Sequence, residues 1–100
     1  MAWRRVQVRT IPNADTVFEN MSDEVVSYMT TNYDDTGKRT SFNLSKSADE
    51  LVLTYTSVFK DEASKNEMLS DSTIAAEITR RDNINAANGI TKEVTVDEEV

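Results

Sequence analysis

The chain has 100 residues, with 11 Lys and Arg against 18 Asp and Glu, a formal net charge of −7, and neither Cys nor His. This composition excludes disulfides, thiolate zinc sites, iron–sulfur clusters, and Ser-His-Asp or Cys-His catalysis. The negative charge disfavours nucleic acid as a partner, and no apolar run is long enough to span a membrane. We therefore expect one small acidic domain over residues 1–100, located in the cytoplasm.

Apolar side chains are scarce for a folded domain. Leu, Ile, Val and Phe together make 22 of the 100 residues, which is close to the roughly 20% below which a strongly charged chain tends to stay disordered. A domain of this size also leaves much of its surface unburied. The composition therefore favours association with another chain, which would bury more apolar surface, and we expect a homo-oligomer.

The first predicted element is a strand over residues 3–11, which Pro12 ends. Alternation places Val6 and Val8 on one face, and the other face carries Trp3, Arg5, Gln7 and Arg9. The arginines of this strand fit a basic rim that balances the acidic C-terminal half better than they fit an anion site.

A helix is predicted next, from Asp15 to about Asn32. Apolar residues recur there at spacings of three and four, and Asp15 is placed to cap the first turn. An interruption at Ser22-Asp23 is left open. Residues 33–37 then form a turn.

A hairpin of two strands is predicted over residues 39–44 and 51–59. In the first strand Thr40, Phe42 and Leu44 alternate with Arg39, Ser41 and Asn43. The second strand places Leu51, Leu53, Tyr55 and Phe59 on one face, and Val52, Thr54, Thr56 and Val58 on the other. Because both faces of the second strand carry apolar or β-branched residues, both are expected to be covered.

The C-terminal part predicts a split helix and a last strand. The helical pieces cover residues 61–69 and 71–87, with Ile74 and Ile78 on the apolar side of the second and Gly89 as its stop signal. Residues 91–96 form the strand, with Val94 and Val96 on one face. Residues 97–100 are expected to be a frayed acidic tail.

The resulting β-α-β-β-α-β order predicts an α+β, ferredoxin-like fold with a four-stranded antiparallel sheet and all helices on one face. This arrangement leaves the other sheet face bare. The simplest cover is a second copy of the chain, packed sheet to sheet in a homodimer with a space between the sheets.

Two segments carry a family resemblance. Leu53 to Ala63 combines a strand that ends in an aromatic residue with an acidic helix start and an alanine, and Ile11-Pro12-Asn13 leads out of the first strand. In these features the sequence resembles the dimeric α+β barrel superfamily, in particular proteins of the antibiotic-biosynthesis monooxygenase type. The resemblance in element order covers nearly the whole chain.

The resemblance implies a homodimer that holds a small apolar or aromatic molecule, with neutral Trp, Tyr and Asn side chains binding the substrate of the cofactor-independent members. The family's characteristic Glu and His correspond to Ser57 and Met68 here, which argues against haem degradation, so we expect no cofactor and no metal. Residues of the neutral and aromatic types give four candidates for the lining of a cavity between the sheets: Trp3, Asn43, Tyr55 and Phe59. If the face of Tyr55 and Phe59 points to the helices instead, these two residues are core.

Two other patterns have simpler explanations. Asp35-Thr36-Gly37 matches the tripeptide of aspartic proteases, but it follows Tyr33-Asp34 rather than an apolar strand and is better explained as a turn. The acidic pairs lack the alternating spacing of a calcium loop and are typical of solvated helix starts and turns.

Three hypotheses for function stay open. The first is a ligand-binding ferredoxin-like dimer with no evident catalytic group. The second is a cofactor-independent monooxygenase or isomerase acting on an aromatic substrate. The third is a structural or assembly protein that binds another chain through a sheet edge or helical face.

Overall fold

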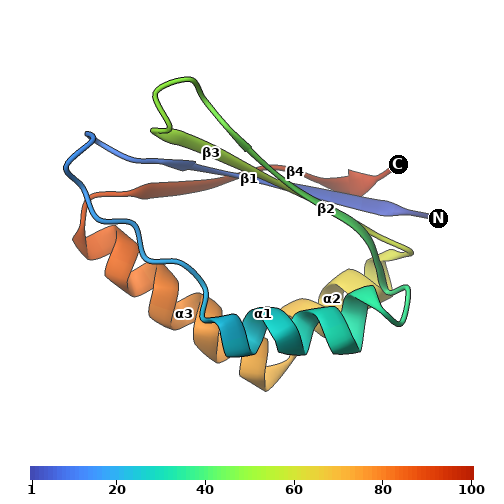
Figure 1. Cartoon of the computed structure of the whole chain (residues 1–100). Coiled ribbons are helices and arrows are strands. Elements are labelled where there is room, and N and C mark those ends of the chain that lie inside the picture. Colours follow the sequence, from blue (N-terminus) through green and yellow to red (C-terminus); the bar gives the residue numbers. More distant parts are fainter.

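The computed structural model describes all 100 residues of the chain. Its element order agrees with the expected one, including the split of the second helical region (Figure 1). In chain order the elements are β1 (Trp3–Thr10), α1 (Asp23–Met29), the π-helical turn η1 (Thr30–Asp34), β2 (Arg39–Lys46), β3 (Val52–Phe59), α2 (Glu62–Ser70), α3 (Ser72–Ala87) and β4 (Thr91–Glu99).

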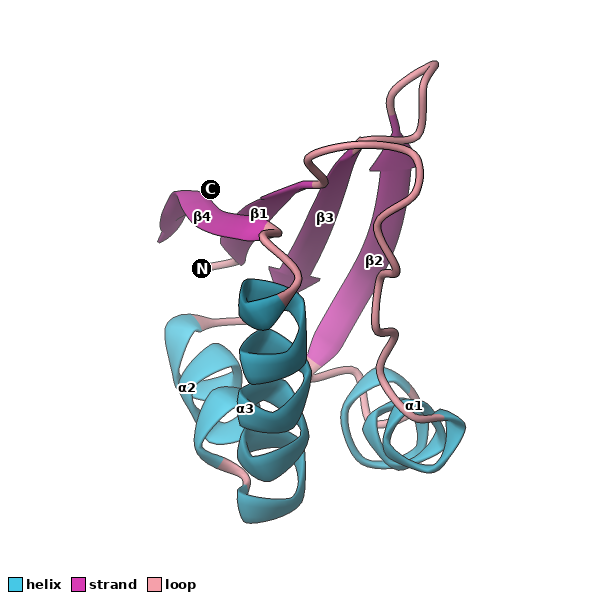
Figure 2. Cartoon of the chain, turned by 90° about the vertical axis from the view of Figure 1, so that its left-hand side faces the viewer, coloured by secondary structure: helices cyan, strands magenta, loops and turns pink.

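The four strands form one antiparallel sheet in the order β2-β3-β1-β4. All helices lie on the same side of this sheet, with α1 apart from α2 and α3 (Figure 2). This strand order and helix placement confirm the α+β, ferredoxin-like fold. None of the helices is long and apolar enough to cross a bilayer.

The register of the strands settles which face of β3 is covered by helices. Leu53 and Phe59 are buried, and Phe59 packs with Met29, Met68 and Ile74 of the helices. The helix-facing side of β3 is therefore the side of Leu53, Tyr55 and Phe59. The opposite face pairs Val6 with Thr56 and Val8 with Thr54 across β1 and β3, and no helix covers it.

The apolar core is small and lies at one end of the helical layer. Only 13 of the 100 residues are buried, and six of these are polar or charged. The core cluster consists of Met29, Tyr33, Phe59, Met68 and Ile74. The thin core predicted from composition is thus present, and much of the remaining interior between sheet and helices is polar.

The helix expected from Asp15 is corrected, because α1 begins only at Asp23 and is capped by Ser22. The preceding segment, residues 11–22, runs along α3 without helical hydrogen bonds (Figure 1). Side chains of α3 satisfy its backbone: Asn85 accepts a hydrogen bond from the Glu19 N–H at 2.8 Å and donates to the Glu19 carbonyl at 3.1 Å. Glu77 accepts from the Ser22 N–H at 2.6 Å. These tertiary bonds replace the helical ones that the local spacing predicted.

Two register irregularities correct the expected strand faces. A shift between Arg39 and Ser41 breaks the alternation of β2, so that Arg39 and Phe42 both face the helices. A second shift, in the pairing of β1 with β4, aligns Val96 with Val6 but Val94 with Gln7, which places the two valines on opposite faces. Bulges of this kind are not visible in a two-residue pattern.

The ends of the C-terminal elements test two further expectations. Gly89 ends α3 with φ +81°, a left-handed conformation that suits glycine, and Ile90 after it is buried. The expected frayed tail over residues 97–100 is wrong for Asp97, Glu98 and Glu99, which continue β4 opposite Arg5, Arg4 and Trp3. Opposite charges across the strands favour this pairing.

Candidate functional site

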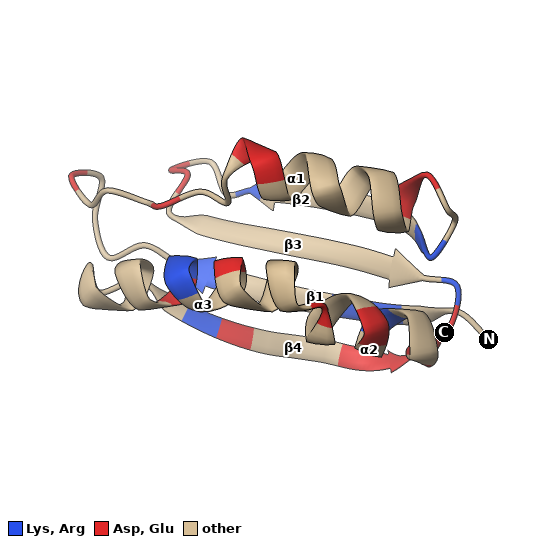
Figure 3. Ribbon diagram, turned by 90° about the horizontal axis from the view of Figure 1, so that it is seen from below, with Lys and Arg blue, Asp and Glu red and all other residues tan.

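A pocket of about 340 Å³ lies on the helix-facing side of the sheet. Its lining residues come from the segment before α1, from α1 and η1, from β2 and β3, and from α3. Figure 3 shows α1 and α3 side by side on the same side of the sheet. It is the single pocket of the chain. Its lining residues are Asn20, Met21, Val26, Met29, Thr30, Asp34, Arg39, Phe42, Leu44, Tyr55 and Arg81.

The sheet side of the pocket is an apolar and aromatic wall. Leu44 pairs directly with Tyr55 across the hairpin, and the rings of Phe42 and Tyr55 lie 6.3 Å apart in a tilted arrangement. Directly opposed residues of an antiparallel pair point to the same face, so the hairpin register brings these three side chains together. Phe42 remains 49% exposed and Leu44 40% exposed, which is unusual for large apolar side chains that lie side by side.

The helix side of the pocket is also mainly apolar. Val26, Met29 and Thr30 follow the spacing of one helical face, and Val26 is 47% exposed. Met21, from the segment that α3 holds in place, completes this wall. The hydrogen bonds from Glu77 and Asn85 to that segment therefore also position part of the pocket.

Asp34 and Arg39 close one end of the pocket as an ion pair. Arg39 donates two hydrogen bonds to the Asp34 carboxylate, at 2.6 and 2.9 Å, and its guanidinium lies 4.7 Å from the centre of the Phe42 ring. Both carboxylate oxygens of Asp34 are engaged in this fork. The two charges therefore neutralise each other, and the pair forms a polar edge of the pocket.

Arg81 also lines the pocket, and although the charges of Asp82 and Glu77 act on it, it forms no direct ion pair. Its side chain is only 8% exposed, its Nε is buried without a hydrogen-bond partner, and its guanidinium carbon lies 5.9 Å from the centre of the Tyr55 ring. Burial, together with the neighbouring Arg9, lowers the pKa of Arg81 from its usual value. The pKa of Tyr55 is raised by burial, against the opposing effect of Arg81 and Arg9.

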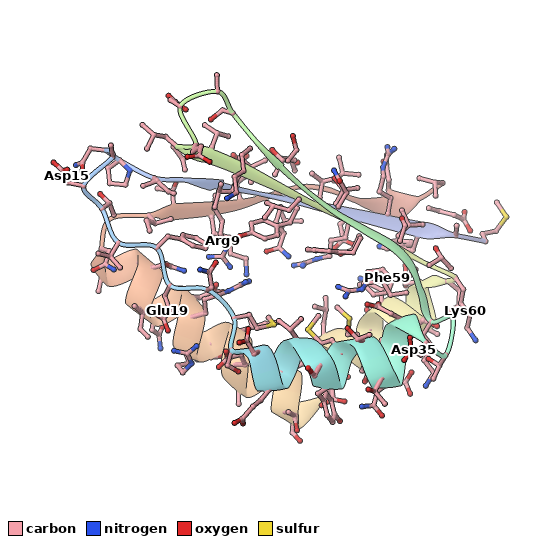
Figure 4. All side chains as sticks on the ribbon, in the orientation of Figure 1. Arg9, Asp15, Glu19, Asp35, Phe59 and Lys60 are labelled. Atoms are coloured by element: carbon pink, nitrogen blue, oxygen red, sulfur yellow. The ribbon has the colours of Figure 1, made fainter.

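Next to Arg81 lies a group of charges that is already paired. Arg9 is 1% exposed and points from β1 toward the helices (Figure 4), where it binds Asp82 at 2.6 Å. Lys92 takes the second oxygen of Asp82 at 2.8 Å. Burial acts to raise the pKa of Asp82, but the hydrogen bonds from Lys92 and Arg9 outweigh it and hold that pKa below its usual value.

The four sequence-predicted cavity residues do not converge on one site. Tyr55 lines the pocket, whereas Phe59 is buried in the core and Trp3 packs on the core edge, where its indole N–H donates to Asp97 and Lys65 lies 5.0 Å from its ring centre. Asn43 pairs with Thr56 and shares the bare face. Of the four, only Asn43 lies on the face that a sheet-to-sheet dimer would enclose, because Trp3, Tyr55 and Phe59 share the helix-facing side.

Sequence reasoning missed most of the pocket, although part of its signal was present. Phe42 and Leu44 could have been joined to Tyr55 by aligning the hairpin. Arg81 lies on the buried stripe of α3, which runs through positions 74, 77, 81 and 85. A basic residue at the helical spacing of the core is a recognisable sign of a buried charge.

The motifs set aside from the sequence have structural roles. Asp34 pairs with Arg39, and Thr36 donates to the carbonyl of Asn32 at 2.8 Å, so the segment Asp34 to Gly37 forms a turn, with Gly37 at φ +77°. The arginines of β1 pair with acids of the C-terminal half, as expected. They do not form a rim, however, because β1 is a central strand and Arg9 is buried beneath the sheet. No group of three or more acidic side chains is close enough together to hold a metal ion.

Comparisons with known proteins identify no family for the chain. No protein-family profile matches the chain, and no curated protein matches it. Among solved structures it is similar to the protein Rv0793 from Mycobacterium tuberculosis, with 17% sequence identity, a TM-score of 0.46, and coverage of 98% of this chain and 99% of that one. The fold assignment therefore rests on the strand order and helix placement of the chain itself.

Proposed function

We propose that the protein binds a small, mainly apolar or aromatic molecule in the pocket between α1 and the β2–β3 hairpin. The observation that carries this proposal is the gathering of Val26, Phe42 and Leu44, three exposed large apolar side chains, around one concave site. Its volume of about 340 Å³ falls within the range of small-molecule sites. Exposed apolar side chains that adjoin one another are typical of surfaces that bind something.

The test is a titration of the 15N-labelled protein with 2-naphthamide, a neutral aromatic probe, followed by amide chemical shifts. Thr30→Trp fills the pocket from its α1 wall, and Thr91→Trp places the same bulk on β4 as a matched control. We expect the wild type and Thr91→Trp to bind with equal affinity, and Thr30→Trp to bind at least tenfold more weakly. Equal affinity in all three proteins would contradict the proposal, as would a wild type that binds neither this probe nor its carboxylate analogue 2-naphthoate.

We also propose that the protein acts as a homodimer through the bare face of the sheet. Support comes from the side chains on that face, where Val6, Val8, Val52 and Val58 alternate with threonines and stay partly exposed. The small core of the single chain favours additional burial. A two-fold interface would place the same patch of valines and threonines on both copies.

Sedimentation velocity tests the dimer. Val6→Lys introduces a charge at the centre of the bare face, and Val17→Lys introduces the same charge at an exposed position outside it. The expected result is a monomer for Val6→Lys and an unchanged dimer for Val17→Lys. A monomeric wild type at micromolar concentration would overturn this part of the proposal.

Cofactor-independent oxygenation of an electron-rich aromatic molecule is a second candidate function. One observation favours it, namely the cationic Arg81 beside Tyr55 in a largely apolar pocket, where it would stabilise an anion formed from the substrate. With 1-naphthol as the probe, oxygen uptake above the protein-free rate that is lost in Arg81→Gln would support this activity. Uptake equal to the protein-free rate would contradict it.

A further inference from the structure

Arg81 is an unpaired guanidinium in a buried position. It is 8% exposed and borders the pocket, its Nε is buried without a hydrogen-bond partner, and its terminal nitrogens form no ion pair within the chain. A guanidinium stays protonated in proteins, and a buried charge without a counter-charge is strongly unfavourable. The arrangement is therefore incomplete in the free chain, unlike the neighbouring Arg9, which is paired.

No carboxylate near Arg81 is free to serve as its counter-ion. Both oxygens of Asp82 are bound, one to Arg9 and the other to Lys92. Glu77 gives one oxygen to Arg80 and the other to the Ser22 N–H and Arg80. In the pocket itself, Asp34 is occupied by Arg39.

The local charge balance contrasts with that of the whole chain. The chain has a net charge of −7, yet the two carboxylates that act on Arg81, Asp82 and Glu77, are engaged by other cations. Arg9 and Lys92 bind Asp82, and Arg80 binds Glu77, which leaves a local excess of positive charge at Arg81. An anion that reaches Arg81 from the pocket would meet this excess of positive charge. Arg81 would orient the anion, because a guanidinium can bind a carboxylate through two parallel hydrogen bonds.

We propose that Arg81 binds the carboxylate of the ligand, so that the pocket selects a small monocarboxylic acid with an apolar or aromatic body. This inference rests on the proposed function, because it names the ligand class of the same pocket. The aromatic wall of Phe42, Leu44 and Tyr55 takes the body of the acid, and Arg81 takes its charge. The neutral polar pair Asp34–Arg39 closes the other end.

The test compares 2-naphthoate with 2-naphthamide, which have the same shape and the same number of heavy atoms but differ in charge. Amide chemical shifts of the 15N-labelled protein report the affinity and the site of binding for each probe. We expect the wild type to bind 2-naphthoate at least tenfold more tightly than 2-naphthamide, with shifts in β2, β3 and α1. In Arg81→Gln the preference should disappear through loss of 2-naphthoate affinity, while 2-naphthamide binds as before.

Two further variants make the result specific. Arg4→Gln removes the same charge from the bare face of the sheet, where Arg4 is 3.7 Å from Glu98, and should keep the full preference. Arg81→Lys keeps the charge but not the two-pronged geometry, and should keep part of the preference. Removal of an unpaired buried charge is not expected to unfold the chain, and the spectrum of each variant reports its fold directly.

The possible failures are distinguishable. If neither probe binds the wild type, the proposed function fails and this inference fails with it. If both probes bind equally, the pocket stands and the selection of an acid is overturned. If Arg81→Gln keeps the preference for 2-naphthoate, the assignment to Arg81 is overturned.

Discussion

At the scale of single residues, Phe59 is central to the small apolar core of this domain. Phe59 is 1% exposed and forms the part of the core that β3 contributes, against Met29, Met68 and Ile74. The sequence predicted a covered strand face for Phe59 but left open whether that face points to the helices or to a second sheet. The structure assigns it to the helices, and so to stability rather than to the lining of a cavity.

We predict that Phe59→Ala lowers the free energy of unfolding by about 3 to 5 kcal/mol, because it leaves a cavity in a core of only five residues. Urea denaturation followed by circular dichroism measures the change. As a control, Phe42→Ala removes a ring that is 49% exposed and should cost much less. Similar losses for the two variants would mean that the core is not where the structure places it.

A second residue-scale prediction concerns Glu77 and acid. Hydrogen bonds from Arg80 and from the Ser22 N–H hold the pKa of Glu77 at about 2, below its ordinary value of 4.5. A carboxylate with a lowered pKa stabilises the fold above its unfolded pKa, and the contribution is lost as pH falls through the folded value. Glu77→Gln should therefore cost about 1 to 3 kcal/mol at pH 7 and progressively less from pH 4.5 down to pH 2. Denaturant titrations of both proteins across this range measure the difference, and a constant difference would contradict it.

Among the elements, the least predictable is the segment before α1. Its apolar spacing is helical, but α3 supplies side-chain partners for its backbone at Val17, Glu19 and Ser22. Local pattern cannot reveal bonds to residues some 55 to 71 positions away. By contrast, β1, β3, α2 and α3 follow local alternation, helical spacing and capping, and their positions were predicted within a residue or two.

We predict that Asn85→Ala frees this segment locally. The Glu19 amide loses its acceptor, and its hydrogen exchange should speed up at least tenfold, with a loss of about 1 to 3 kcal/mol in the free energy of unfolding. Exchange measured by NMR gives the local effect. Asn88→Ala removes the neighbouring bond to Val17 and should leave the Glu19 amide protected. Equal exchange at Glu19 in both variants would show that the segment is held by other contacts.

The same contrast applies to the candidate site. Tyr55 was a candidate for a cavity between two sheets and was expected to be core if its face pointed to the helices, whereas it lines a pocket on the helix side. The wall of that pocket also depends on the bulge in β2 and on the non-helical course of residues 11–22. Each of these depends on tertiary pairing rather than on spacing. A single sequence therefore supplied one residue of the pocket's wall, on a different argument, and neither the pocket nor its charge.

For the whole molecule, the proposed homodimer makes stability depend on concentration. Only folded chains pair through the bare sheet face, so mass action favours the folded state as concentration rises. We predict that the melting temperature rises by about 5 °C over a hundredfold increase in protein concentration. Scanning calorimetry measures this, with Val6→Lys as the control that should show no dependence. An unchanged melting temperature in the wild type would argue against a dimer.

The charge carried by β4 has a consequence for how sheets of different copies meet. As a border strand, β4 has one side that pairs with no other strand, which is a template for edge-to-edge association. It carries Glu93, Asp97, Glu98 and Glu99 along its length, seen as red bands in Figure 3. With Lys92 as the one cation of the strand, two such borders brought together would face each other with net negative charge. Continuous sheets and fibrils are therefore disfavoured on this side, while broad contact between sheet faces stays open.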